Sequence, residues 1–196
     1  KNKGGWHQKI RLPADPSYRG QLSMENVKVL TSGKDIQLQI TMDEVTNEWN
    51  PPFGYDHVYF NVFFDFPGCI GKEFFPKLDY AQDNFDFNLG FLLYGWGTRS
   101  FGSSDSTKDS YGLPRPGDIT SFVDLPQKKI TFTFSGEFFS VLKSFSGIKI
   151  FISTWDGYLG DFRSIASTKE NWNFYIINHQ IREKIPKIFD RILISI

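Results

Sequence analysis

Acidic side chains are the residues of this sequence with the greatest capacity for catalysis. Hydrolysis of a glycosidic bond requires two carboxyl groups held on opposite sides of a sugar. Nothing in the local spacing pairs two of the carboxyl groups, and carboxylates are common in solvated or hydrogen-bonded loop positions. We therefore predict no catalytic residue. The carboxyl groups weighed for this role are Asp43, Glu44, Asp56, Asp65, Asp79, Asp83, Asp86 and Asp156.

Nucleophilic, metal and haem chemistry lack their usual sequence patterns. There is no Gly-x-Ser-x-Gly motif, and His7, His57 and His179 have no neighbouring Ser or Cys of a catalytic type. Metal-type His and Cys spacing is absent, and Met24 and Met42 occupy expected core positions of strands rather than haem-ligand positions. A structural calcium ion stays open, since such sites collect oxygen atoms from scattered loops. No cofactor is predicted with certainty, and the metal ligands are unknown.

Charge and composition exclude two classes of partner. Lys plus Arg and Asp plus Glu number 22 each, so the formal net charge is zero and no positive field would attract nucleic acid. No apolar run is long enough for membrane insertion. Cys69 is the single cysteine, and we expect its thiol to be a small buried apolar group.

Tryptophans near strand ends are the most informative residues. Trp49 lies in the turn "WNPPFG", Trp96 in "YGWG", and Trp155 where "KIFISTW" meets "DGYLGDFR". An aromatic ring at a strand end, with polar groups nearby, can stack on the C–H face of a pyranose while those groups bind its hydroxyls. The alternative is that each ring fills the end of the core. The predicted carbohydrate-binding set is Trp49, Tyr55, Trp96, Arg99, Trp155, Asp156, Tyr158 and Arg163.

The elements that position these residues are almost all strands. In "DIQLQITM" apolar and polar residues alternate, as in a half-buried antiparallel strand, while "HVYFNVFFDF" (57–66) is apolar on both faces and is expected to be a central strand. The fold class is all-β, a two-sheet antiparallel β-sandwich with one short helix at 136–145. Residues 97–118 are expected to form a surface loop. Further strands are expected at 25–30, 85–96, 120–124, 129–134, 147–155 and 171–177.

Five segments in order resemble the C-terminal module of glucodextranase and related modules that end some alpha-amylase-family glycosidases: "NEWNPPFGYDHVYFNVFFDFPG", "FLLYGWGTRSF", "VDLPQKKITFTF", "STWDGYLGDFRSIA" and "IPKIFDRI". The resemblance implies a DOMON-like β-sandwich similar to family nine carbohydrate-binding modules, and a non-catalytic role in binding sugars or surfaces. The family's patterned positions correspond to Trp49, Asp56, Trp96, Trp155, Asp156 and Arg163. One departure is "SYRGQL" after Asp15-Pro16, where many members have a segment linked to calcium.

Together these observations predict a single accessory module over residues 1–196, part of a larger protein, since the chain opens with "KNKGGW" and no initiator Met. We expect it to bind α-glucan or a related polysaccharide beside the catalytic domain of a secreted or periplasmic glycosidase of the alpha-amylase type. The alternatives are an interaction module that docks on a domain or cell surface without sugar affinity and, less favoured, a free-standing glycosidase. In "STWDGYLGDFR", we expect Asp156 and Gly157 to turn the chain, and Arg163 to reach Asp156 or Asp161.

Overall fold

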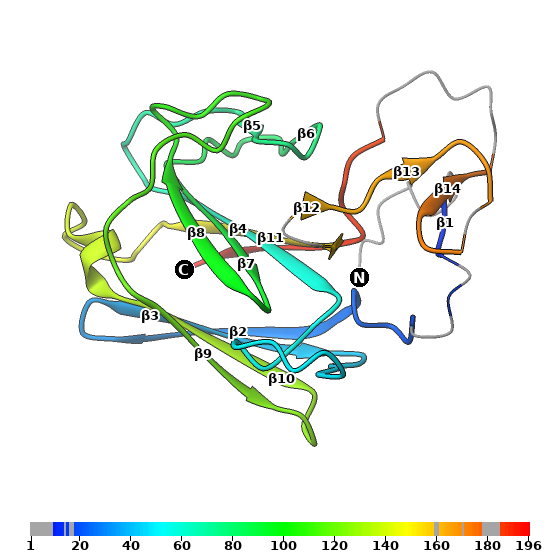
Figure 1. Cartoon of the computed structure of the whole chain (residues 1–196). Coiled ribbons are helices and arrows are strands. Elements are labelled where there is room, and N and C mark those ends of the chain that lie inside the picture. Colours follow the sequence, from blue (N-terminus) through cyan, green and yellow to red (C-terminus); the bar gives the residue numbers. More distant parts are fainter. Residues whose placement is uncertain (1–9, 14, 16–17, 159–160, 170, 178–184) are drawn as a thin grey trace.

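A computed structural model describes the chain except for residues 1–9, 14, 16–17, 159–160, 170 and 178–184. Two antiparallel sheets face each other, so the predicted β-sandwich is confirmed (Figure 1). The core contains mainly Phe, Ile, Leu and Val side chains. Within the described residues, no helix is long and apolar enough to cross a lipid bilayer.

The first sheet has the strand order β2-β3-β10-β9, with strands Met24–Ser32, Asp35–Met42, Lys129–Phe134 and Ile119–Asp124. In β3, Ile36, Leu38, Ile40 and Met42 are fully buried or nearly so, and the residues between them are partly exposed. This alternation confirms the predicted half-buried strand. One face of the sheet therefore closes the core, and the other faces solvent.

The second sheet has the order β12-β11-β4-β7-β8, with β15 also paired to β11. Strand β4 lies between β11 and β7, which confirms the central position expected for it. The bounds of these strands are β12 Asp161–Phe162, β11 Lys149–Tyr158, β4 Val58–Asp65, β7 Leu89–Tyr94, β8 Gly97–Gly102 and β15 Asp190–Ser195.

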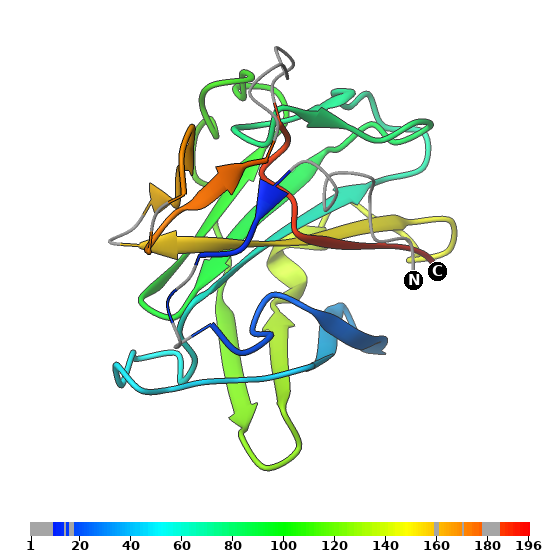
Figure 2. The same cartoon turned by 90° about the vertical axis from the view of Figure 1, so that its right-hand side faces the viewer.

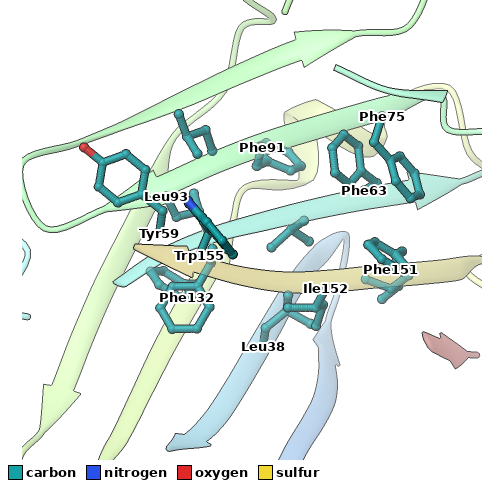
Figure 3. Close-up of a cluster of buried hydrophobic side chains, with 14 of the residues drawn as sticks. Leu38, Tyr59, Phe63, Phe75, Phe91, Leu93, Phe132, Phe151, Ile152 and Trp155 are labelled. Carbon is teal, nitrogen blue, oxygen red and sulfur yellow. The ribbon is translucent and has the colours of Figure 1, made fainter. Parts of the chain in front are cut away.

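Strand β4 contributes to packing on both of its faces, because alternate side chains point to opposite sides of a sheet. Phe60 contacts Phe132 of the first sheet, with ring centroids 5.4 Å apart, and so fills the space between the sheets. Phe63 points to the other side and stacks on Phe75, with centroids 4.3 Å apart. In Figure 3, Phe63 and Phe75 lie on one side of β4, and Phe132 lies on the other side.

Short strands cover the outer face of the second sheet (Figures 1 and 2). The hairpin of β5 (Phe74–Phe75) and β6 (Tyr80–Ala81) covers one part. A three-stranded sheet, in the order β1-β14-β13, lies over another. Its strands are Ile10–Arg11, Phe174–Ile176 and Ile165–Ala166.

Several local predictions were wrong. The expected helix at 136–145 is a single 3-10 turn, Gly136–Phe139, because the adjacent rings of Phe138 and Phe139 are both buried, against Phe91 and Phe64 respectively. The expected loop at 97–118 begins as strand β8. Cys69 is exposed rather than buried.

Candidate functional site

Two tryptophans meet at the surface where two turns approach each other. Trp49 belongs to the segment before β4, and Trp96 lies between β7 and β8. Their ring centroids are 6.0 Å apart, with planes inclined by 38°. The residues are 43% and 46% exposed, so each keeps a large accessible area. We call Trp49 and Trp96 the tryptophan pair; two of the three tryptophans expected at strand ends lie together.

Asp56 fixes the turn that carries Trp49. Its carboxylate is buried and accepts hydrogen bonds from the Thr46 hydroxyl and from the Trp49 backbone N–H, the latter at 2.9 Å. The Asp56 N–H in turn donates to the Thr46 carbonyl at 2.9 Å. A carboxylate held by these bonds orders the backbone, so Asp56 acts on the surface through Trp49 rather than through direct contact.

His57 supports the Trp49 ring from beneath, a contact that sequence reasoning missed. The two ring centroids are 4.1 Å apart, and His57 is only 5% exposed. Burial lowers the pKa of His57, against the opposing effect of nearby Asp56. The imidazole is therefore neutral near pH 7, and the contact is aromatic packing. The backbone of His57 has a φ of 64°. Residue spacing in the sequence does not indicate this conformation, so it could not predict the contact with Trp49.

Gly95 allows the two turns to join. The Phe53 N–H donates to the Gly95 carbonyl at 2.9 Å. A Cβ at Gly95 would overlap the Tyr55 carbonyl oxygen and lie 2.9 Å from the Cβ of Pro51. Only glycine permits this close approach of the two segments. Because Pro51 also restricts its own backbone, the tryptophan pair stands on a rigid base.

Tyr55 is an anchor of this base rather than a surface residue. It is fully buried, with edge-to-face contacts to Phe60 and Phe132 at 5.8 and 5.9 Å. Burial raises the pKa of its hydroxyl well above the ordinary value. The ring offers no accessible face to a ligand.

Trp155 is also buried, although we expected it at a strand end. It is 0% exposed, its ring stacks on Phe174 with centroids 4.3 Å apart, and its Nε1–H donates to the Arg163 carbonyl at 2.9 Å. The expected turn at Asp156 and Gly157 is wrong, because β11 continues through both residues. Trp155 pairs with Tyr59 of β4 inside the sheet, so its ring presents no face to a sugar.

Asp156 and Arg163 form the predicted ion pair. The Arg163 Nε–H donates to Asp156 Oδ2, and the Arg163 backbone N–H donates to the Asp156 carbonyl at 3.0 Å. Asp156 is fully buried. Burial raises the pKa of Asp156 to about 6, although the guanidinium of Arg163 opposes this rise. The ion pair links β11 to the residue that directly follows β12, and its carboxylate lies in the interior of the structure.

Two predicted binding residues, Arg99 and Tyr158, remain to be placed. Arg99 is an exposed residue of β8, with its guanidinium 5.4 Å from the centroid of the Tyr111 ring. The side chain of Tyr158 lies outside the described residues.

Beside Trp49 in the sequence, Glu48 forms an ion pair with Arg19 at 3.2 Å, and both side chains are about half exposed. This ion pair, whose acidic member directly precedes Trp49 in the sequence, was not anticipated.

Acidic and metal-ligating side chains do not gather into a cluster in the described part of the chain. No group of three or more His, Cys, Asp or Glu side chains there could hold a metal ion. Asp56 and Asp156, the two buried aspartates, both accept hydrogen bonds from neighbouring groups. What the arrangement can do is present an exposed aromatic surface on a fixed base.

A β-sandwich that displays aromatic rings from the turns at its end has the properties of a binding module. The chain belongs to the family of C-terminal, SLH-like binding modules of glucodextranase, whose model matches residues 9–195. The expected family membership is thereby confirmed. A search of curated proteins found no match.

Proposed function

We propose that this chain binds a neutral polysaccharide, an α-glucan or a close relative, through the tryptophan pair. The observation that carries the proposal is the pair itself: two indoles, each nearly half exposed, 6.0 Å apart at their centroids. Indole faces stack on the C–H face of a sugar ring. The Glu48–Arg19 ion pair beside Trp49 offers groups for the hydroxyls.

Rigidity makes this surface suitable for a flexible polymer. Ordering the side chains and the sugar costs free energy on binding, and a surface that is already fixed reduces that cost. Asp56 and Gly95 fix the two turns before any ligand arrives. Stacking on two rings and a few hydrogen bonds then correspond to a dissociation constant between about 10 µM and 1 mM, or roughly 4 to 7 kcal/mol.

In this proposal the chain is a single non-catalytic module of a larger glycosidase of the alpha-amylase type, acting outside the cytoplasm. A polysaccharide outside the cell is too large to enter intact, so a hydrolase that acts on it, with the attached module, would be secreted or periplasmic. The module would keep the catalytic domain close to its polymer by raising the local substrate concentration. Membership in a family of glucodextranase binding modules supports this arrangement.

Calorimetric titration with maltooligosaccharides and isomaltooligosaccharides tests the proposal. Trp96→Ala is expected to weaken binding about fivefold to tenfold, since an aromatic contact contributes about 1 kcal/mol. Trp172→Ala is the matched control, because Trp172 is 61% exposed but precedes β14 in a different sheet. Equal affinity of the wild type and Trp96→Ala would refute the site. Absence of binding to every glucan, with retained binding to the parent catalytic domain, would favour an interaction module instead.

A further inference from the structure

The outer face of the first sheet carries a polar hollow that the tryptophan pair does not explain. The hollow has a volume of about 390 Å³ and spans strands β3, β10 and β9. No strand covers this side of the first sheet in Figures 1 and 2. The hollow is lined by Gln37, Gln39, Thr120, Ser121, Phe122, Asp124, Lys129, Thr131 and Thr133.

Glutamine and threonine side chains form an ordered row across this hollow. Gln39 Nε2 donates to Gln37 Oε1 at 3.2 Å, and Gln37 Nε2 donates to Thr133 Oγ1 at 3.1 Å. A primary amide has two N–H donors and an oxygen that accepts two hydrogen bonds. Each glutamine therefore keeps donors and acceptors for a ligand while its orientation is fixed by a neighbour. Alternating donors and acceptors of this kind match the hydroxyl groups of a sugar.

Phe122 adds an aromatic ring to the same hollow. It is 69% exposed, and its register partner on β10 is Thr131. Single exposed apolar side chains are common on protein surfaces, and this one is relevant because it lines the hollow. Phe122 thus offers a stacking face next to the hydrogen-bonding groups.

The charges at the hollow balance each other. Lys129 and Asp124 are register partners on adjacent strands, and they are the two ionisable residues of the lining. A lining with one positive and one negative group gives no net attraction to a polyanion or a phosphate. The neutral lining favours an uncharged, hydroxyl-rich ligand.

We propose that this hollow is a second binding site for the same neutral glycan, which rests on the proposed function of the chain. The ligand lies across β3, β10 and β9, with one sugar ring on Phe122 and its hydroxyls bound to Gln37, Gln39 and the threonines. The volume falls within the range of small-ligand sites. Two weak sites on one module bind a long polymer more tightly than either site alone.

Titration of the whole chain with maltoheptaose, followed by NMR of side-chain N–H signals, tests the second site. The side-chain amide signals of Gln37 and Gln39 report on the hollow, and the indole signals of the tryptophan pair report on the first site. Both sets are expected to shift in the wild type. In Phe122→Ala and in Gln39→Ala, the affinity of the hollow for maltoheptaose is expected to fall about fivefold or more, while the shifts of the indole signals stay unchanged.

Leu30→Ala is the matched control: Leu30 is 46% exposed, its register partner is Gln37, and it is not part of the lining. Glutamine signals that stay in place while the indole signals shift would overturn the second site and leave the proposed function intact. Absence of any shift with maltoheptaose or an isomaltooligosaccharide would overturn both. Binding lost in Leu30→Ala as strongly as in Phe122→Ala would also overturn the assignment.

Discussion

Replacing Trp155 with Ala separates a core ring from a ligand-binding ring. Trp155 is fully buried and stacks on Phe174 at 4.3 Å. Removal of a buried tryptophan side chain typically costs about 3–5 kcal/mol. It would also leave the Arg163 carbonyl without the indole N–H that it accepts at 2.9 Å, which adds about 1 kcal/mol. We expect a loss of about 4–6 kcal/mol out of a total stability of about 5–15 kcal/mol.

Urea unfolding followed by circular dichroism measures this loss, and thermal unfolding gives an independent value. At about 2–4 °C per kcal/mol for a chain of this size, the melting temperature should fall by about 8–24 °C. Trp155→Phe keeps a ring against Phe174 but loses the N–H, so it should cost much less. Trp96→Ala, at a residue 46% exposed, should change stability by less than about 1 kcal/mol. A Trp155→Ala protein as stable as the wild type would refute the reasoning.

Three further outcomes follow from the same contacts. Gly95→Ala should lower both stability and glycan affinity, since its Cβ would overlap the Tyr55 carbonyl oxygen and push the two turns apart; unchanged indole NMR signals would contradict this. The pKa of Asp156 is about 6 in the folded state against an ordinary 3.8, so the folded state holds this proton more tightly than the unfolded state does. Its contribution to the free energy of unfolding should therefore be greatest below pH 4, and of the order of 3 kcal/mol of that free energy should be lost as pH rises to 6. Comparing melting temperature against pH in the wild type and Asp156→Asn checks the slope, which should be shallower in the variant over that interval. Glycan affinity should be the same between about 0.05 and 1 M NaCl, because a neutral ligand forms no ion pairs to be screened; a steep salt dependence in calorimetry would contradict stacking as the main contribution.

Much of the fold could be predicted because alternation is a local property. The period-two pattern of β3 and the two-sided apolar run of β4 each define a strand and its burial within eight residues. Strand limits were harder to predict, because they depend on partners far along the chain. Strand β11 continues past Trp155 since Asp156 has a partner, Val58, on β4, a pairing that local turn propensity at an Asp-Gly sequence cannot show.

In the candidate site, too, local features could be predicted from the sequence and long-range contacts could not. Trp49 and Trp96 could be selected by their turns, and the Arg163–Asp156 contact by their separation of seven residues. Burial of Trp155 could not be predicted, because Phe174 reaches it from a strand that begins nineteen positions later in the sequence. The hollow on the first sheet was missed for a different reason. Its glutamines and threonines follow the ordinary polar side of a half-buried strand, and only the register of three strands gathers them.

The two apolar faces of β4 have a consequence for how the chain chooses its strand alignment. In a strand with one apolar face, a slip by one residue exposes that face to water and is strongly disfavoured. Strand β4 has buried residues on both faces, so hydrophobicity discriminates only weakly against such a slip. The carboxylate of Asp56, bound to Thr46 and to the Trp49 N–H just before the strand begins, fixes where β4 starts. The turn that carries Trp49 therefore also determines which phenylalanines of the central strand point between the sheets.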